Sequence, residues 1–115
     1  MSMVEQQCAF FDDARKLIDW VRADLGWLVT SGEFWRPVEM QQIYVRTGRS
    51  KTMNSRHLQR MAMDLNFFDK AGNPIVNFGD LAKVGMKWES MNPKNRWGGN
   101  FKNFKDTPHY ERVPE

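Results

Sequence analysis

The chain has 115 residues and a formal net charge of +3, with 41% hydrophobic, 27% charged and 13% aromatic residues. This size suits one globular domain, so we expect a single domain over residues 1–115 and exclude a catalytic domain joined to a separate targeting module. The basic residues form no dense cluster along the chain, which is compatible with a polyanionic partner but identifies none.

The cysteine content and the N-terminal segment bear on where the protein is made. Cys8 is the only cysteine, so neither an internal disulfide nor a cysteine-based zinc finger can form. The N-terminal segment is polar and lacks the apolar core of a signal peptide, and no stretch has the length of a membrane span. We therefore expect synthesis in a cytoplasm, no signal peptide and no membrane insertion.

Three elements are expected in the first half of the chain. Apolar residues recur at three- and four-residue steps over residues 7–25, which predicts a helix that stops at Gly26. The apolar segment 27–34 predicts a strand. A second helix is expected over residues 37–48, with proline in its first turn, and a polar loop over residues 49–54.

The second half begins with a period-two pattern over residues 61–68, which predicts a strand with two different faces. The alternation assigns Met63, Leu65 and Phe67 to one face and Ala62, Asp64 and Asn66 to the other. A turn follows over residues 69–73, and a third helix should start at an Asn77 cap and stop before Pro93. The tail predicts loops around a strand at residues 109–113. This mixed order favours an α+β domain, a small antiparallel sheet with flanking helices.

Two histidines are the centre of the candidate chemistry. His57 precedes Asp64 by seven positions, and His109 follows Asp106 by three. A catalytic zinc takes three protein ligands and keeps one position for water, and His57, Asp64 and His109 would supply two imidazoles and a carboxylate. Asp106 could then accept a proton from the attacking water, and Ser55 could orient His57.

Each pattern taken alone also has a purely structural interpretation. A histidine and an aspartate seven positions apart are usually surface polar residues, and an aspartate shortly before a proline is common turn chemistry. Arg36 could simply be a residue near a helix start. Aromatic side chains usually belong to the core. Trp97 is the exception we single out, because Gly98 and Gly99 follow it and would allow a ligand to approach the backbone.

The motifs built from these residues resemble a known family. Ser55, His57 and Asp64 form Ser-x-His-x6-Asp, and Asp106 and His109 form Asp-x-x-His near the C-terminus. Together they resemble the zinc D-alanyl-D-alanine carboxypeptidases and the L-alanyl-D-glutamate endopeptidases, which share a fold with the Hedgehog signalling domain. The flanking sequences NSRHLQRMAMDLNFF and NRWGGNF are similar to those of short phage and prophage members used as endolysins. The resemblance runs from the first helix to the last strand.

This resemblance implies a role for each matching position. It implies that His57, Asp64 and His109 bind zinc and that Asp106 is the catalytic carboxylate. Arg36 matches an arginine that binds the substrate carbonyl or the oxyanion, where a fixed cation stabilises developing charge.

Further positions bear on substrate binding, and two residues depart from the family pattern. Either Gln41 or Gln42 matches a glutamine that supports Arg36, and Ser55 and Trp97 complete the expected substrate-binding set. Better-known members have a small residue, usually glycine, at the position of Arg60, whereas short phage-type members often carry a basic residue there. Asp106 stands where the D,D-peptidases of antibiotic resistance have glutamate, which favours the endopeptidase branch.

The resemblance therefore implies a zinc metallopeptidase that cuts peptidoglycan stem peptides, as an L-alanyl-D-glutamate endopeptidase used as a phage endolysin. The partner would be bacterial peptidoglycan, reached at the cell wall or periplasm, with no nucleic acid and no second subunit. Three alternatives stay open: a D-alanyl-D-alanine carboxypeptidase, a non-catalytic zinc-containing wall-binding module of the same fold, and a small basic nucleic-acid-binding protein. The last would bind with a steep salt dependence, but no helix carries clustered base-reading residues.

Overall fold

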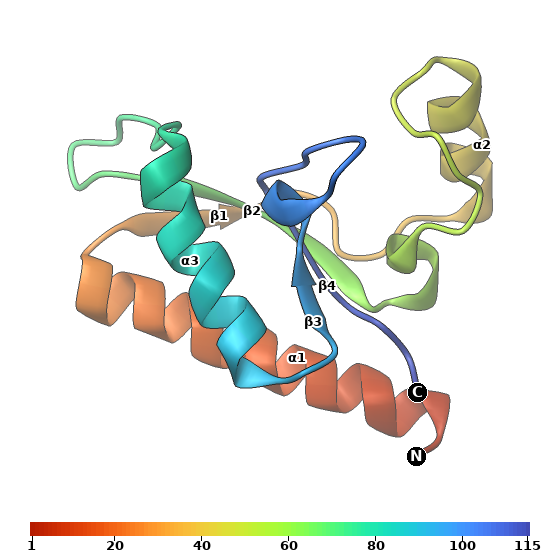
Figure 1. Ribbon diagram of the computed structural model, residues 1–115, viewed down its shortest axis with the longest axis horizontal. Helices are drawn as coiled ribbons and strands as arrows, with labels where there is room; N and C mark the ends of the chain where they lie inside the picture. Colours follow the sequence, from red (N-terminus) through yellow and green to blue (C-terminus); the bar gives the residue numbers. More distant parts are fainter.

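Four short strands form one antiparallel sheet in the order β1-β2-β4-β3 (Figure 1). The computed structural model describes residues 1–115. The elements are α1 Met3–Trp20, a π-helical turn η1 Val21–Leu25, β1 Leu28–Ser31, α2 Val38–Arg46, a 3-10 turn η2 Arg56–Gln59, β2 Ala62–Phe68, α3 Phe78–Met91, β3 Asn95–Trp97, a second 3-10 turn η3 Gly98–Asn100 and β4 His109–Arg112. Nothing in this set of helices is both long and apolar enough to cross a membrane.

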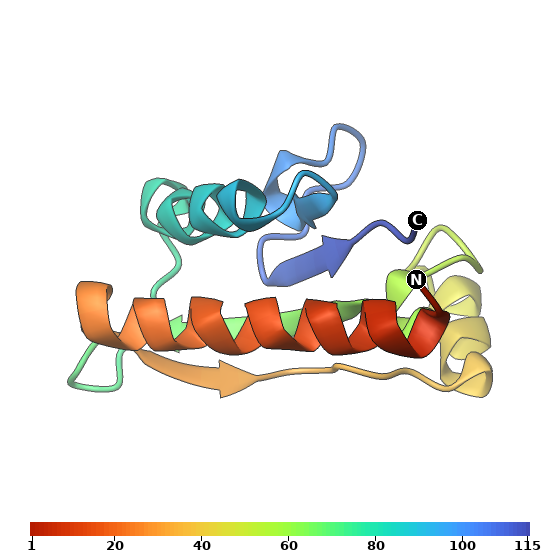
Figure 2. The ribbon, with the colours of Figure 1, turned by 90° about the horizontal axis from the view of Figure 1, so that it is seen from below.

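The central strand β2 has one apolar face and one polar face, as its alternation predicts. Met63, Leu65 and Phe67 are buried, at no more than 3% exposure. On the other face Asn66 is exposed and Asp64 is half-buried, whereas Ala62 is buried. The buried face packs against both long helices. Its core partners are Phe10, Ala14 and Leu17 of α1, Leu81, Val84 and Trp88 of α3, and Tyr110 of β4. Figure 2 shows α1 lying across β2 on this side. The opposite face of the sheet is thereby left free for polar side chains.

The three predicted helices are confirmed, but some of their end residues differ from the prediction. The first helix starts at Met3 rather than near residue 7, because Ser2 and Glu5 form a capping box. It continues beyond Trp20 as the π-helical turn η1, and the whole helical segment stops at Gly26 in a left-handed conformation, as predicted. The second helix stops at Arg46. The third is capped by Asn77, whose side chain accepts a hydrogen bond from the Asp80 amide.

The predicted strands are also found, and one was missed. The first strand, β1, is shorter than the expected residues 27–34, and β4 occupies all but one residue of the expected 109–113. Strand β3 was not predicted, because three residues are too few for a recognisable period. It exists through pairing with β4, where Trp97 lies opposite Tyr110.

Replacing Gly85 of α3 by alanine is expected to destabilise the fold. A Cβ at this position would overlap the Trp97 ring, and overpacking of this kind costs about 1–3 kcal/mol. That exceeds the ~1 kcal/mol by which alanine is favoured over glycine inside a helix. Thermal or urea unfolding of Gly85→Ala should therefore show a net loss.

Gly79→Ala in the same helix is the matched control. Its Cβ would meet only Asn77 Oδ1, the acceptor that caps α3, at 3.1 Å, so we expect a smaller loss of stability than in Gly85→Ala, where the added Cβ meets a buried ring. Equal stabilities of the two variants would contradict the packing described here.

Candidate metal centre

The register of two strands places Asp64 beside His109. Strands β2 and β4 are antiparallel, and Asp64 is the direct partner of His109. Their sequence neighbours Met63 and Tyr110 point into the core, so both polar side chains project from the opposite face. Directly opposed residues on one face have Cβ atoms only about 5 Å apart. The sheet alone therefore brings the carboxylate and one imidazole together.

His57 reaches the same point from the turn η2. The Ser55 hydroxyl caps this turn by accepting a hydrogen bond from the His57 amide at 3.2 Å. The ring Nδ1 of His57 lies 3.1 Å from the carbonyl oxygen of Phe34. Because a carbonyl can only accept, Nδ1 carries the proton. The lone pair of Nε2 then faces Asp64 Oδ1 at 3.3 Å.

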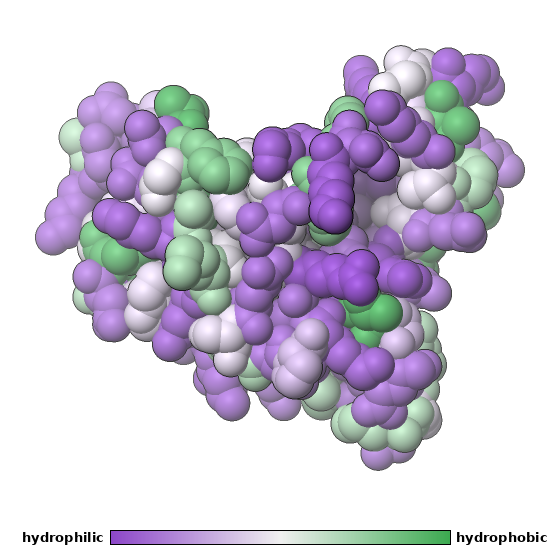
Figure 3. Space-filling view, viewed as in Figure 1, coloured by the Kyte–Doolittle hydropathy of each residue, from purple (hydrophilic) through white to green (hydrophobic).

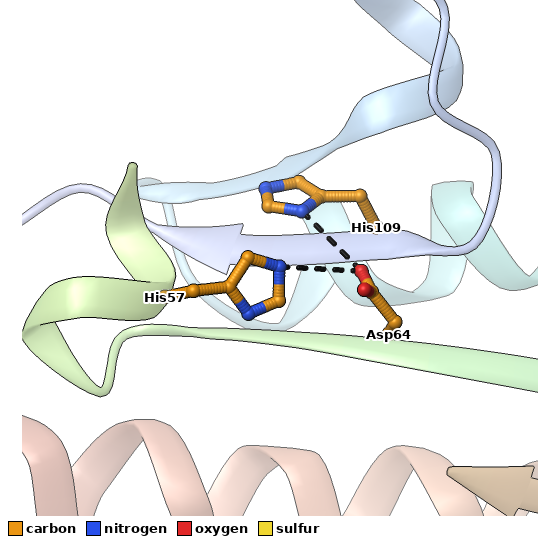
Figure 4. Close-up of side chains that lie close together, drawn as sticks. All are labelled: His57, Asp64 and His109. Carbon is orange, nitrogen blue, oxygen red and sulfur yellow. Dashed lines mark ion pairs between the residues drawn. The ribbon is translucent and has the colours of Figure 1, made fainter. Parts of the chain in front are cut away.

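His109 is oriented by a second carboxylate. Its Nε2 lies 2.7 Å from Glu111 Oε1, so in the neutral ring the proton resides on Nε2 and the Nδ1 lone pair faces Asp64 Oδ1, at 3.5 Å. Figure 4 shows both rings directed at the Asp64 carboxylate. Ligand atoms of the three residues all lie within 4.8 Å of one another.

This arrangement fits a metal ion. Asp64 Oδ1 is buried and accepts no hydrogen bond, although a buried acceptor without a partner is costly. Two imidazole lone pairs facing a carboxylate need a proton or a cation between them. Two nitrogen donors and one carboxylate oxygen are a donor set that zinc accepts. The residues His57, Asp64 and His109, expected to be ligands, are thus brought together.

The metal-free cluster holds a proton on His109. Burial opposes the charge on His109, but Asp64 and Glu111 outweigh it and raise the pKa of His109 to about 9. Burial likewise opposes ionisation of Asp64, yet the two imidazoles lower its pKa to about 2. A metal ion would have to displace the His109 proton, as is usual for imidazole ligands.

Asp106 lies at the rim of the cluster. Its Oδ2 is 3.9 Å from His109 Nδ1, and its side chain is 38% exposed. Partial burial raises the pKa of this carboxyl. The turn that holds it depends on Gly98, since a Cβ there would overlap the Asp106 carbonyl and the Asp106 amide donates to the Gly98 carbonyl at 2.9 Å.

Arg36 is held rigidly at the edge of the site. Only 8% of the residue is exposed. The guanidinium donates to Gln41 Oε1 at 2.6 Å and, through Nε and Nη2, to Glu33 Oε1 at 3.0 and 2.7 Å. The Ser55 hydroxyl lies 3.4 Å from Nη1. The glutamine expected to support this arginine is therefore Gln41, since Gln42 is exposed.

The substrate-binding prediction for Trp97 is wrong. Its ring is 1% exposed and belongs to the core, where its Nε1 donates to the Thr107 carbonyl at 2.8 Å. The glycines after it do not open a path for a ligand, because a Cβ at Gly99 would overlap the Trp97 ring and one at Gly98 the Asp106 carbonyl. Large aromatic side chains are core residues in this fold, as their usual role suggests.

Three residues of the site were missed from sequence. Glu111 orients His109, Glu33 neutralises Arg36, and the ring of Tyr44 lies 4.6 Å from the Arg36 guanidinium. Glu111 could have been found, because a residue two positions after a ligand on a strand shares its face. The sequence gives no comparable indication for Glu33 and Tyr44, because a loop places Glu33 beside Arg36 and a separate helix, α2, places Tyr44 there.

An open cleft of about 720 Å³ leads to the cluster. One wall is the loop 49–56 with Tyr44 of α2, and the other is the loop 101–106. Figure 3 shows a hollow between the projecting lobe that holds α2 and the main body, with hydrophilic residues on both sides. Ser55 lines this cleft, but its hydroxyl is engaged in capping η2; its contact with a substrate stays a prediction.

Comparisons with known proteins agree with this geometry. A family model described as D-alanyl-D-alanine carboxypeptidase matches residues 48–112. The L-alanyl-D-glutamate peptidase of Listeria phage A118 is 35% identical over 101 residues, which are 85% of this chain and 34% of that protein. The chain thus spans about a third of the length of this curated relative.

A solved structure gives the same result for the fold. The crystal structure of the Serratia marcescens L-Ala D-Glu endopeptidase ChiX is similar with a TM-score of 0.66 and 26% sequence identity. The match covers 86% of this chain and 79% of that one. The predicted α+β fold with a small antiparallel sheet is confirmed.

The metal-free protein should show a characteristic pH dependence of stability. The pKa of His109 rises from 6.5 to about 9 on folding, so its contribution is complete below pH 6.5 and is lost as the pH rises to 9. The pKa of Asp64 falls from 3.8 to about 2, so its contribution is lost only as the pH falls below 3.8. Thermal unfolding of chelated protein should give the highest Tm between these limits and a loss of up to ~3 kcal/mol towards pH 9.

The variant His109→Gln tests the contribution of His109 to this pH dependence. Glutamine keeps a polar side chain without titrating, so the decline between pH 6.5 and 9 should flatten. A Tm of the chelated wild-type protein that rises over this interval would show that His109 is not protonated in the fold.

Proposed function

The chain belongs to the D-alanyl-D-alanine carboxypeptidase family of peptidases, and from this we propose that it is a zinc-dependent endopeptidase that hydrolyses the L-alanyl-D-glutamate bond of peptidoglycan stem peptides. The observation that carries the proposal is the convergence of His57, Asp64 and His109 on one buried, unpartnered oxygen at the end of an open cleft. The two similar proteins named for L-alanyl-D-glutamate cleavage support the choice of bond.

In this proposal, His57, Asp64 and His109 hold the zinc ion. A zinc ion bound there would polarise the scissile carbonyl and make water a stronger nucleophile at neutral pH. Glu111 keeps His109 in the tautomer whose Nδ1 is free, and the Phe34 carbonyl does the same for Nε2 of His57. Both ligands are therefore preorganised.

Asp106 is the proposed proton carrier. Its carboxylate lines the cleft next to the cluster and is partly open to solvent. Burial raises its pKa, which brings it closer to neutrality and makes it a better general base and acid. It can take the proton of the attacking water at a carboxylate oxygen and pass it to the leaving amine.

Arg36 is the proposed electrostatic stabiliser. Its guanidinium lines the same cleft and is fixed by Gln41 and Glu33. A cation held in place before the reaction costs no reorganisation when negative charge develops on the carbonyl oxygen. The paired Glu33 reduces its net charge but also prevents it from turning away.

The wider biological role follows as part of the same proposal. Residues 1–115 would form one catalytic domain that acts as a monomer on peptidoglycan of the cell wall, as a phage endolysin does. The description of the matching family makes a D-alanyl-D-alanine carboxypeptidase the second candidate. The two activities differ in the bond they break, which a direct experiment separates.

Digestion of purified peptidoglycan tests the bond. Mass spectrometry of the fragments should reveal new amino groups on glutamate, and EDTA should abolish their release because the ligands then hold no metal. Release of free alanine from the stem terminus would instead identify the carboxypeptidase. An intact wall after digestion with zinc-loaded protein would contradict the proposed peptidase activity altogether.

Substitution of Asp106 tests the mechanism. Asp106→Asn should retain about one zinc per chain, because Asp106 is not among the three ligands, and should lower kcat by about 10²–10⁴. Asp64→Asn is the matched control, with the same chemical change at a ligand, and should lose zinc as well as activity. If Asp106→Asn digests peptidoglycan at the wild-type rate, the chain has no need of this carboxylate, and a different proton carrier must be sought.

A further inference from the structure

Charge is divided unevenly along the cleft. Its acidic lining residues are Glu33, Asp64, Asp106 and Glu111. Every one of them has a basic partner: Arg36 for Glu33, the two histidines for Asp64, and His109 for both Asp106 and Glu111. The acids of the cleft are therefore compensated within the site itself.

The basic side chains show the opposite situation. The cleft is lined by Arg36, Arg49, Lys51, Arg56 and Lys102. Arg36 pairs with Glu33, and Arg56 lies 3.9 Å from Glu111. The other three, Arg49, Lys51 and Lys102, are exposed and form no ion pair. We call these three the outer cations.

The outer cations stand on both walls of the cleft. Arg49 and Lys51 belong to the loop 49–56, and Lys102 belongs to the loop 101–106. The two loops approach each other, because the Lys51 ammonium lies 5.6 Å from the centre of the Phe104 ring. A ligand in the cleft would therefore meet positive charge from two sides.

Aromatic rings connect the outer cations to the reactive end. The Tyr44 ring lies 4.6 Å from the guanidinium of Arg36 and 5.7 Å from that of Arg49. On the other wall, the ring of Phe101, which precedes Lys102, lies 5.7 Å from the ring of His109. Arg49 is thus one side chain away from Arg36, and Lys102 follows a residue whose ring packs beside His109.

A peptide with a free carboxylate beside the scissile bond fits this layout. Glutamate has two carboxyl groups, and when one of them continues the peptide the other stays free and negatively charged. A carboxylate accepts charge-assisted hydrogen bonds from arginine and lysine. We propose that Arg49, Lys51 and Lys102 form a subsite for the free carboxylate of an acidic residue next to the scissile bond. This inference rests on the proposed peptidase function.

Long polyanions fit less well than a short acidic peptide. The outer cations number only three and line a cleft of about 720 Å³, whereas a long polyanion is bound by a more extended basic surface. Subsites of this kind act on substrate binding, so their loss should appear mainly in KM.

Two matched peptides test the subsite. Both carry the L-alanyl-D-glutamate bond, one with the free glutamate carboxylate and the other with that group as a neutral amide. The zinc-loaded wild-type protein should cleave the carboxylate peptide with a kcat/KM about 10-fold or more above that of the amide, since exposed ion pairs each contribute a few-fold. The difference should shrink as salt is added.

Variants then assign the preference to the outer cations. In Arg49→Gln/Lys51→Gln/Lys102→Gln, kcat/KM for the carboxylate peptide should fall, mostly through KM, until the two peptides are cleaved alike. Lys16→Gln, an equal charge change per residue on the exposed side of α1, should keep the wild-type ratio. Thermal unfolding checks that each variant is folded.

The outcomes separate this inference from the proposed function. If the wild-type protein cleaves both peptides with the same kcat/KM, the subsite is refuted while the peptidase stands. If the triple variant loses activity equally on both peptides, the outer cations serve general attraction or loop structure, and the subsite is again refuted. If neither peptide is cleaved by the wild-type protein, the proposed bond specificity itself fails.

Discussion

One buried carboxylate oxygen organises the whole site. Asp64 Oδ1 has no hydrogen-bond donor and faces one ring nitrogen of each histidine. The Phe34 carbonyl and the Glu111 carboxylate occupy the other nitrogens, so neither neutral ring can turn a proton towards Asp64 without losing its own partner. Only an added proton or a cation relieves this conflict, and the metal-free fold relieves it by protonating His109.

The backbone makes that conflict unavoidable. Pairing of β2 with β4 sets Asp64 opposite His109, and the segment after β1 continues along β2, where the Asp64 amide donates to the Glu33 carbonyl at 2.8 Å. The same segment presents the Phe34 carbonyl to His57 and then delivers Arg36 to the cleft. Sheet pairing thus places Asp64 and His109, and the segment after β1 that continues it fixes the tautomer of His57 and the position of Arg36.

The small helix α2 has a different role from α1 and α3, which pack in the core. It contributes to the site through Gln41, which is fully buried and bridges Arg36 to the Thr52 carbonyl at 2.6 Å. A buried guanidinium is tolerated because its donors are satisfied by Gln41 and Glu33. The same bridge ties the loop 49–56 to the arginine, so the wall of the cleft and the reactive centre are mechanically connected.

The sequence by itself determined most local elements and singled out His57, Asp64 and His109, the three residues that the fold brings together. Period-two alternation in β2 already separated Asp64 from the core, Gly26 and Asn77 marked two helix ends, and two histidines near carboxylates left few possible donors. Only the tertiary structure decided the choice of Gln41 over Gln42, the roles of Glu33, Tyr44 and Glu111, and the core position of Trp97. Local patterns report on neighbours along the chain, whereas these roles depend on strand register and on loops that meet across a cleft. Pairing between distant segments leaves no periodic signal in the residues that take part in it.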